Sequence, residues 1–417
     1  MIRDALLALG IVMSYATQLT IPGLPIGYAE LFLALWIVLS IGRVLAGGRL
    51  EPSTALTQLV AFWLILAFTL GVGAIVGYLT TVLFLAPVLH DTLAYALLVG
   101  ITCLTVAEPD AERRLRSIGW WIIAFANAGF AWQIGLAWGW VHQPGVDPWY
   151  WDRFCGWSDN PNQLALYCAI FGPLALHLAT TTGSRWGRLL GLCSMISTFY
   201  IGRLTKSDTY LYATILASLI FLVLRLGALF AARSETPGLL RQLAALLVIG
   251  CLPLAVAMTP YALTQVSNAE DFAKSLTKDK GGEATAETAE LRLYLWSEAL
   301  DKGMKSGSLG LGPGPHLERP PITGLQFLPR PFEAHSTIID LYTQGGLIAV
   351  LGLVWFGGMA AINAWRAKMD TLLALLASIA VFAVPHLIIR HPIVWFSLTM
   401  CLVTKTGRTI PMTVHQG

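Results

Sequence analysis

Long runs of hydrophobic residues, separated by short polar breaks, occupy most of this 417-residue chain. A helix that crosses about 30 Å of hydrocarbon needs roughly 20 mostly apolar residues. The pattern therefore predicts an all-α polytopic membrane protein with about 12 transmembrane helices. Their expected positions are 4–21, 28–47, 56–78, 88–108, 118–138, 162–182, 186–203, 208–232, 240–261, 336–362, 371–389 and 391–405.

The longest polar interval, about 262–335, contains an amphipathic helix in which Arg292 and Trp296 lie four residues apart and share one face. The LGLGPG stretch that follows this helix has neither the preceding strand nor the lysine of a P-loop, so we interpret it as a backbone turn. The chain then divides into three parts. These are helices 1–9 (1–261), a helical loop (262–335), and helices 10–12 with the C-terminus (336–417).

Basic residues collect after every even-numbered predicted helix. Because positive residues favour the cytoplasmic side of a membrane, both termini are predicted to be cytoplasmic. The 262–335 interval then faces the outside, which is the periplasm in a Gram-negative cell. The basic residues in these flanks are Arg43, Arg49, Arg113, Arg114, Arg116, Arg185, Arg188, Arg233, Arg241, Arg366, Lys368, Lys405 and Arg408.

Composition agrees with a membrane protein and excludes other classes. The chain is 56% hydrophobic and 12% charged, whereas a soluble domain carries about 25% charged residues. A net charge of +3 and the lack of a basic run with interleaved aromatics argue against a nucleic-acid partner. The six cysteines are scattered, without a CxxC pair, so we expect neither a disulfide framework nor a metal site of that kind.

Several cations lie in loops that should face outward, against the positive-inside tendency. Headgroup contact or local pairing with an acid explains any single one as well as a ligand does. For the whole set, an anionic ligand at the outer surface is the better explanation. Arg203 and Lys206 are suited to phosphate oxygens, arginine as a two-pronged fork and lysine as a point charge. The set comprises Arg153, Arg203, Lys206, Arg292, Arg319, Arg330 and Arg390.

His335 lies at the predicted outer start of the tenth helix, and Asp340 follows five residues later. A neutral imidazole can accept a proton from a sugar hydroxyl, and an adjacent cation favours the neutral form. The alternative is a polar histidine that caps the helix. Aromatic residues are frequent in the outer loop 139–161, where they indicate an interfacial belt, although their faces can also stack on sugars.

Four segments carry a family resemblance, and a fifth fits it. They are DNPNQLALYCAIFGPLAL (159–176), which includes Asn162; GRLTKSDTYLYA (202–213); RLYLWSEALDKGMKSGSLGLGPG (292–314); EAHSTIIDLYTQGGLIAVLGLVWF (333–356); and RHPIVWF (390–396). Together they resemble the O-antigen ligase and O-antigen/exopolysaccharide polymerase superfamily of bacterial inner membranes. One departure is Asp208, where the family has an arginine, so that either Arg203 or Lys206 supplies the cation.

The resemblance implies a metal-independent, cofactor-free glycosyl transfer at the periplasmic face of the inner membrane. The donor would be a glycan on undecaprenyl diphosphate, and the acceptor a sugar hydroxyl, with inversion at the anomeric carbon. His335 would be the general base, and Arg292 with Arg203 or Lys206 would hold the diphosphate. Supporting residues would be Asp340, Arg153, Asn162, Trp296 and Arg390.

The acceptor distinguishes two enzymes, a polymerase that extends a glycan and a ligase that uses lipid A core. The 262–334 interval has ten acidic against eight basic residues. This balance does not favour a heavily phosphorylated acceptor, and it inclines the prediction slightly toward a polymerase. A transporter or flippase of the same lipid-linked glycan is a further alternative. It would need polar groups through the bundle, where few ionisable residues occur.

Overall fold

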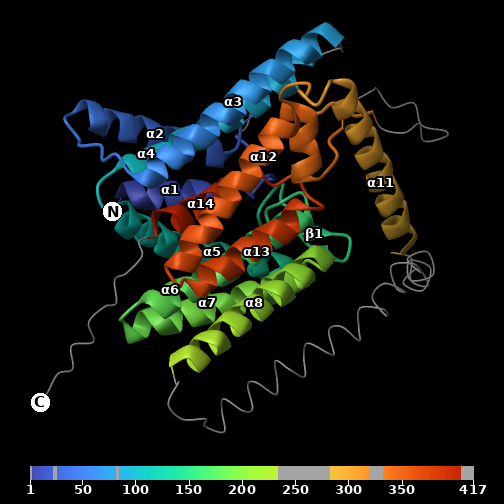
Figure 1. Cartoon of the computed structure of the whole chain (residues 1–417). Helices are drawn as coiled ribbons and strands as arrows, with labels where there is room; N and C mark the ends of the chain where they lie inside the picture. Colours follow the sequence, from blue (N-terminus) through green and yellow to red (C-terminus); the bar gives the residue numbers. More distant parts are fainter. Residues whose placement is uncertain (1, 22–25, 81–83, 233–281, 319–331, 405–417) are drawn as a thin grey trace, which may run out of the picture.

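The computed structural model describes residues 2–21, 26–80, 84–232, 282–318 and 332–404 (Figure 1). The described chain is a bundle of helices with one two-stranded hairpin, β1 (Trp149–Tyr150) and β2 (Arg153–Phe154), so the predicted all-α class is confirmed. The predicted span 240–261 lies outside the described residues. The helices are α1 (Ile2–Met13), α2 (Tyr28–Leu45), α3 (Thr54–Thr80), α4 (Leu85–Ala107), α5 (Ala111–Ala137), α6 (Pro161–Thr181), α7 (Arg185–Leu204), α8 (Asp208–Ala232), α11 (Gly282–Lys305), α12 (Thr337–Arg366), α13 (Asp370–Ala383) and α14 (Pro392–Val403).

Six of the described helices, α2, α3, α4, α6, α8 and α12, are long and apolar enough to cross a membrane. The helices α13 and α14 are apolar but shorter. The first helix ends at Met13, well before the expected end of the first span at residue 21. Helices able to span a membrane are therefore present, while the number twelve and the outward position of 262–335 stay predictions.

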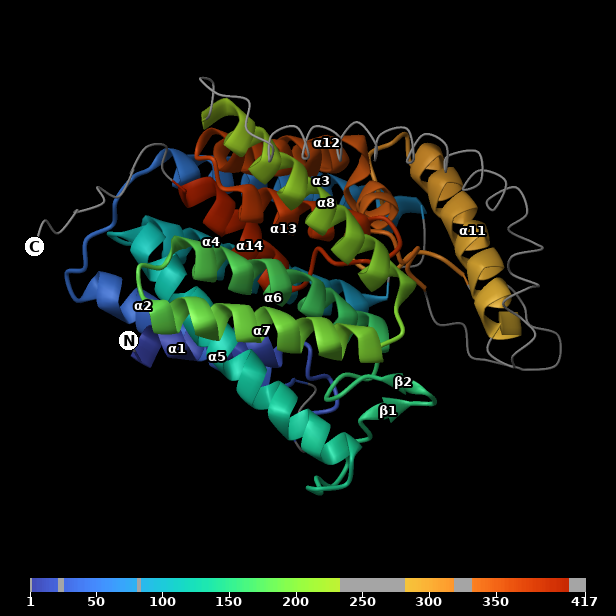
Figure 2. The same ribbon diagram turned by 90° about the horizontal axis from the view of Figure 1, so that it is seen from below.

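Helix α6 lies at the centre of one half of the bundle, packed against α7, α8 and α13 (Figure 2). The Asn160 side chain caps it by accepting a hydrogen bond from the N–H of Asn162 at 2.9 Å. Pro161 takes the first helical position, where a missing N–H has no cost. The DNPNQ stretch thus starts a helix, as the sequence predicts, and places Asn162 at the end of the bundle that carries the hairpin.

Helix α12 is interrupted at Gly346, whose φ of 69° lies outside the helical range. The free carbonyls of Thr343 and Gln344 accept hydrogen bonds from the N–H groups of Leu311 and Gly312, both at 2.8 Å. The predicted turn after the amphipathic helix therefore does more than reverse the chain. It satisfies the broken backbone of α12, as irregular backbone among membrane helices requires, and it fixes α11 against α12.

Basic side chains at the other end of the bundle converge on one carboxylate. Glu108 is 4% exposed and accepts hydrogen bonds from Arg3, Arg43 and Arg114. Arg114 also pairs with Asp4 at 2.5 Å. This cluster joins α1, α2 and α5 at the end that the sequence predicts to be cytoplasmic.

We expect Gly346→Ala to destabilise the protein, because an added Cβ would lie 2.1 Å from the carbonyl oxygen of Ser308 at a positive φ. The strained backbone alone should cost about 1–3 kcal/mol. Gly358→Ala is the matched control on the same helix, since its Cβ would meet nothing within 4 Å. Thermal unfolding in detergent should give a lower Tm for Gly346→Ala and an unchanged or higher Tm for Gly358→Ala. Equal Tm values would refute this role of the break.

Candidate functional site

His335 ends the short segment that leads into α12, and its backbone has a φ of 55°. Residues other than glycine rarely adopt this left-handed conformation, so neighbouring groups must hold it. The buried Asp340 carboxylate accepts hydrogen bonds from the N–H groups of Ala334 (2.7 Å) and Ser336 (3.0 Å). Hydrogen bonds to Asp340 therefore fix the backbone on both sides of His335, and with it the direction in which the imidazole leaves the chain.

Trp296 connects α11 to the same segment. Its indole N–H donates to the carbonyl of Ala334 at 2.9 Å, and Leu295 and Ala299 pack with Ala334 in a small apolar cluster. Arg292 is one turn away from Trp296 on α11 and shares its face. The amphipathic pattern of this helix thus brings Arg292 beside His335, as the electrostatic influence of Arg292 on the imidazole also shows.

Two half-buried arginines face each other across this site. Burial lowers the pKa of Arg292 below its usual value, and the guanidinium of Arg153 lowers it further. Burial also lowers the pKa of Arg153, although the charges of Asp208 and Asp152 act in the opposite direction. The hydrogen bonds of Arg153 go to neutral oxygens of Thr205 (3.0 Å) and Asn162 (2.9 Å). Within the described part of the chain, neither guanidinium forms an ion pair with a carboxylate. Cations that are held this way attract an anion.

The imidazole of His335 is exposed to solvent on one side. The protein around it still lowers its pKa below the usual value, and Arg292 and Arg390 act in the same direction, whereas Glu333 raises it. The ring is therefore neutral at neutral pH. A neutral imidazole with solvent access can accept a proton from a bound hydroxyl group.

Arg390 has a different environment from the other two arginines. Its guanidinium bridges the carboxylates of Asp91, on α4, and Glu333. Burial lowers the pKa of Arg390, but the two carboxylates outweigh this and raise it above its usual value. Arg390 is therefore neutralised by the protein. It holds the segment of His335 against α4 and is not free to bind an anion.

His386 also belongs to this site, although the sequence did not indicate it. Its carbonyl accepts hydrogen bonds from the N–H (3.1 Å) and hydroxyl (2.7 Å) of Thr337. Burial, and then the charges of Arg292 and His335, lower the pKa of His386 to about 3. The backbone of this turn thus holds the start of α12, while the neutral imidazole lies 3.3 Å from the hydroxyl of Thr209 on α8. The nearby RHP sequence at 390–392 was the available signal, because it marks the same turn.

The two other predicted phosphate-binding residues, Arg203 and Lys206, are exposed and lie at the C-terminal end of α7 and just after it. The Lys206 ammonium pairs with the Asp152 carboxylate at 2.5 Å, and both side chains are exposed. Among the interactions described for Arg292 and His335, none involves Arg203 or Lys206. The structure thus gathers Arg153, Asn162, Arg292, Trp296, His335, Asp340 and Arg390 around one centre and leaves these two cations nearer its edge.

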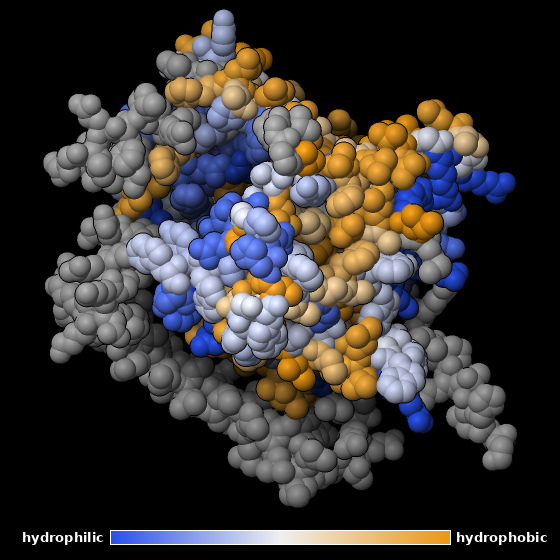
Figure 3. Space-filling model, turned by 180° about the vertical axis from the view of Figure 1, so that it is seen from behind, coloured by the Kyte–Doolittle hydropathy of each residue, from blue (hydrophilic) through white to orange (hydrophobic). Residues whose placement is uncertain are grey.

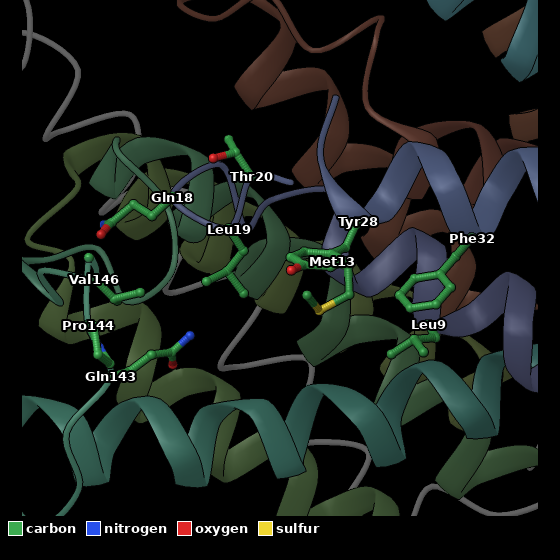
Figure 4. A pocket seen from close by; sticks show the side chains of 11 residues that line it. Leu9, Met13, Gln18, Leu19, Thr20, Tyr28, Phe32, Gln143, Pro144 and Val146 are labelled. Carbon is green, nitrogen blue, oxygen red and sulfur yellow. The ribbon is translucent and has the colours of Figure 1, made fainter. Parts of the chain in front are cut away.

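The molecular surface agrees with a polar site beside α11. The face opposite to that of Figure 1 shows a hollow lined by hydrophilic residues on the side where α11 lies, while hydrophobic surface covers much of the other side (Figure 3). A separate cavity of about 610 Å³ lies between α1, α2 and the loop around Gln143–Val146 (Figure 4). It is lined by uncharged residues such as Met13, Tyr28 and Phe32, and so it is unsuited to an anion.

A comparison with known protein families covers most of the residues of this site. A family model described as O-antigen ligase matches residues 174–354, which include Arg203, Lys206, Arg292, His335 and Asp340. No curated protein and no solved structure matched the chain. The match covers both the amphipathic helix and the start of α12, where the sequence resemblance is most specific. This part of the chain, a little under half of its length, is therefore similar to the O-antigen ligase family.

Proposed function

We propose that this protein is an inverting, metal-independent glycosyltransferase. It would move a glycan from undecaprenyl diphosphate to an acceptor sugar hydroxyl during synthesis of a surface polysaccharide. The observation that carries the proposal is the pair Arg153–Arg292 beside the neutral His335: both guanidiniums are half-buried, the charge of Arg153 acts on Arg292, and neither has a carboxylate at ion-pair distance in the described chain. A diphosphate relieves the repulsion, and the imidazole supplies the base.

The diphosphate would lie against the two guanidiniums. Each can donate two parallel hydrogen bonds to phosphate oxygens. Asn162 and the carbonyl of Thr205 orient the fork of Arg153, and the Trp296 hydrogen bond positions the helix that carries Arg292. Negative charge grows on the leaving diphosphate as the glycosidic bond breaks. Cations that are already oriented stabilise this charge without rearranging.

The acceptor would lie on the other side of His335, toward Glu333. His335 takes the proton of the acceptor hydroxyl while that oxygen attacks the anomeric carbon from the face opposite the diphosphate. The bond from this carbon to the diphosphate oxygen breaks, and its electron pair leaves with the diphosphate. One direct displacement inverts the anomeric configuration. Glu333 stabilises the imidazolium that forms, because its charge raises the pKa of His335.

The arrangement of the bundle supports an active site on the periplasmic side of a bacterial inner membrane. The site lies where α6, α8 and α12 begin and where α5 and α7 end. The arginines around Glu108 lie at the opposite ends of the helices, which agrees with a cytoplasmic surface there. The helix composition supports a multi-pass membrane protein.

A polymerase is favoured slightly over a ligase. The charge balance of 262–334, ten acidic against eight basic residues, disfavours the phosphorylated lipid A core as acceptor. A ligase remains the alternative, and a transporter of the same lipid-linked glycan is a further one.

Removal of the proposed base should abolish transfer. With purified undecaprenyl-diphosphate glycan and EDTA throughout, we expect His335→Ala to lose about 10²–10⁴ of the rate, the usual contribution of a general base. His142→Ala is the matched control, because His142 is an exposed histidine in the outer loop after α5. A product ladder indicates a polymerase, and attachment to lipid A core indicates a ligase. Full activity of His335→Ala would exclude His335 as the base. If the wild type translocates the lipid-linked glycan but transfers no sugar, the transporter is favoured.

The two partnerless arginines should affect stability and activity in opposite directions. Arg292→Gln and Arg153→Gln each remove a half-buried cation, so we expect an unchanged or higher Tm together with a loss of about 10²–10³ in kcat. Arg203→Gln and Lys206→Gln should lose less, because these side chains are exposed and Lys206 is already paired. A larger loss in either of those variants would assign the second phosphate contact to the end of α7.

The pH profile should report the titration of His335. The base works only when neutral, so kcat/KM is retained above its pKa and falls as the pH drops through it. Because that pKa is lowered, the acid limb should lie below the ordinary histidine value of about 6.5. Glu333→Gln removes a charge that raises the pKa and should move the limb to still lower pH. Glu318→Gln is the control with an exposed carboxylate; a limb that stays in place in both variants contradicts the assignment.

A further inference from the structure

The hairpin β1–β2 has an unusual tip. Its strands pair Trp149 with Phe154 and Tyr150 with Arg153, and Trp151 follows in the turn with a φ of 58°. A bulky side chain rarely adopts this backbone conformation. Strained backbone of this kind persists where the surrounding structure enforces it, and it occurs often at binding sites.

The strained turn places two aromatic rings together in solvent. Successive side chains of a strand normally point to opposite faces. Here the rings of Tyr150 and Trp151 are parallel within 7°, with centroids 5.8 Å apart. Tyr150 is 51% exposed and Trp151 is 78% exposed. Together they form an exposed stack of two parallel aromatic rings, which we call the Tyr150–Trp151 platform.

The base of the hairpin is firmly anchored, so the platform has a defined position. Phe154 is fully buried and packs edge-on against Trp149, whose indole N–H donates to the carbonyl of Ala137 at 3.3 Å. Figure 2 shows the hairpin projecting from the end of the bundle at which α11 also lies. The residue opposite Tyr150 in the hairpin is Arg153, one of the two arginines of the proposed phosphate site.

The surroundings of the platform are polar, which separates it from an interfacial aromatic belt. The exposed ion pair between Asp152 and Lys206 adjoins it directly in the turn. A charged pair disfavours insertion of the tip into lipid, while it offers donors and acceptors for sugar hydroxyls. Apolar faces of pyranose rings stack on aromatic rings, whose π faces carry partial negative charge, and nearby polar groups fix the orientation.

We propose that the Tyr150–Trp151 platform binds pyranose rings of the glycan chain and guides the lipid-linked glycan toward Arg153. The inference rests on the proposed function, because the proposed function makes a saccharide the substrate of this protein. It adds a second contact region, separate from the diphosphate and the base, that recognises sugar rings. Such a platform lowers the KM for the glycan and leaves the chemical step to Arg292 and His335.

Binding of a lipid-free glycan tests the platform directly. The probe is the oligosaccharide released by mild acid from the undecaprenyl-diphosphate pool of the source cells, labelled with a fluorophore and followed by anisotropy. We expect saturable binding to the wild type and about a tenfold weaker Kd for Trp151→Ala, with most of the affinity kept by Trp151→Phe. Trp186→Ala is the matched control, since Trp186 is 79% exposed at the opposite end of the bundle.

Equal Kd values for the wild type and Trp151→Ala would overturn the platform. Brominated lipids quench the fluorescence of tryptophans that contact lipid. Weaker quenching in nanodiscs of Trp151→Ala than of the wild type, together with unchanged glycan binding, would identify Trp151 as a belt residue instead.

The transfer assay separates this outcome from failure of the proposed function. A platform predicts that Trp151→Ala raises the KM for the lipid-linked glycan with little change in kcat. An unchanged KM in an active enzyme refutes the platform alone, whereas absence of transfer by the wild type refutes the proposed function.

Discussion

The arrangement of the site depends on keeping two guanidiniums close together, half-buried and without a carboxylate of their own in the described chain. Such a pair is unfavourable in an empty site, since both desolvation and mutual repulsion lower the pKa of Arg292. The fold holds the Arg153 guanidinium through neutral contacts, its bonds to Asn162 and Thr205. The charge is thereby available to a ligand, and the binding energy of an anion can be used where charge develops during the reaction.

A second constraint keeps the halves of the site in register. Arg292 lies on α11, whereas His335 lies in the segment that leads into α12. The glycine-rich turn after α11 satisfies the carbonyls of Thr343 and Gln344 at the break in α12, and Trp296 binds the carbonyl of Ala334. One contact before the start of α12 and one after it thus fix α11 against α12. A site that must hold a base and a cation at one anomeric centre requires this rigidity.

Charge pairing assigns different roles to outer cations that look alike in sequence. Arg390 is neutralised by Asp91 and Glu333, and Lys206 pairs with Asp152. Arg153 and Arg292 have no such partner in the described chain. The sequence predicted an excess of positive charge at the outer surface. Which arginines carry that excess depends on where the carboxylates lie in space, and no spacing along the chain encodes this.

Local physics made much of the molecule predictable from its sequence. Hydrophobic run length predicts most of the described helices, because lipid requires internally bonded backbone. The motifs around Arg292 and His335 lie within the residues that match the O-antigen ligase family model. Helical periodicity placed Arg292 and Trp296 on one face. Tertiary structure alone added His386, paired Arg390, and brought Arg153 from the hairpin to Arg292. These contacts join segments far apart in the chain, and their energies depend on burial and charge proximity, which exist only once the helices have packed.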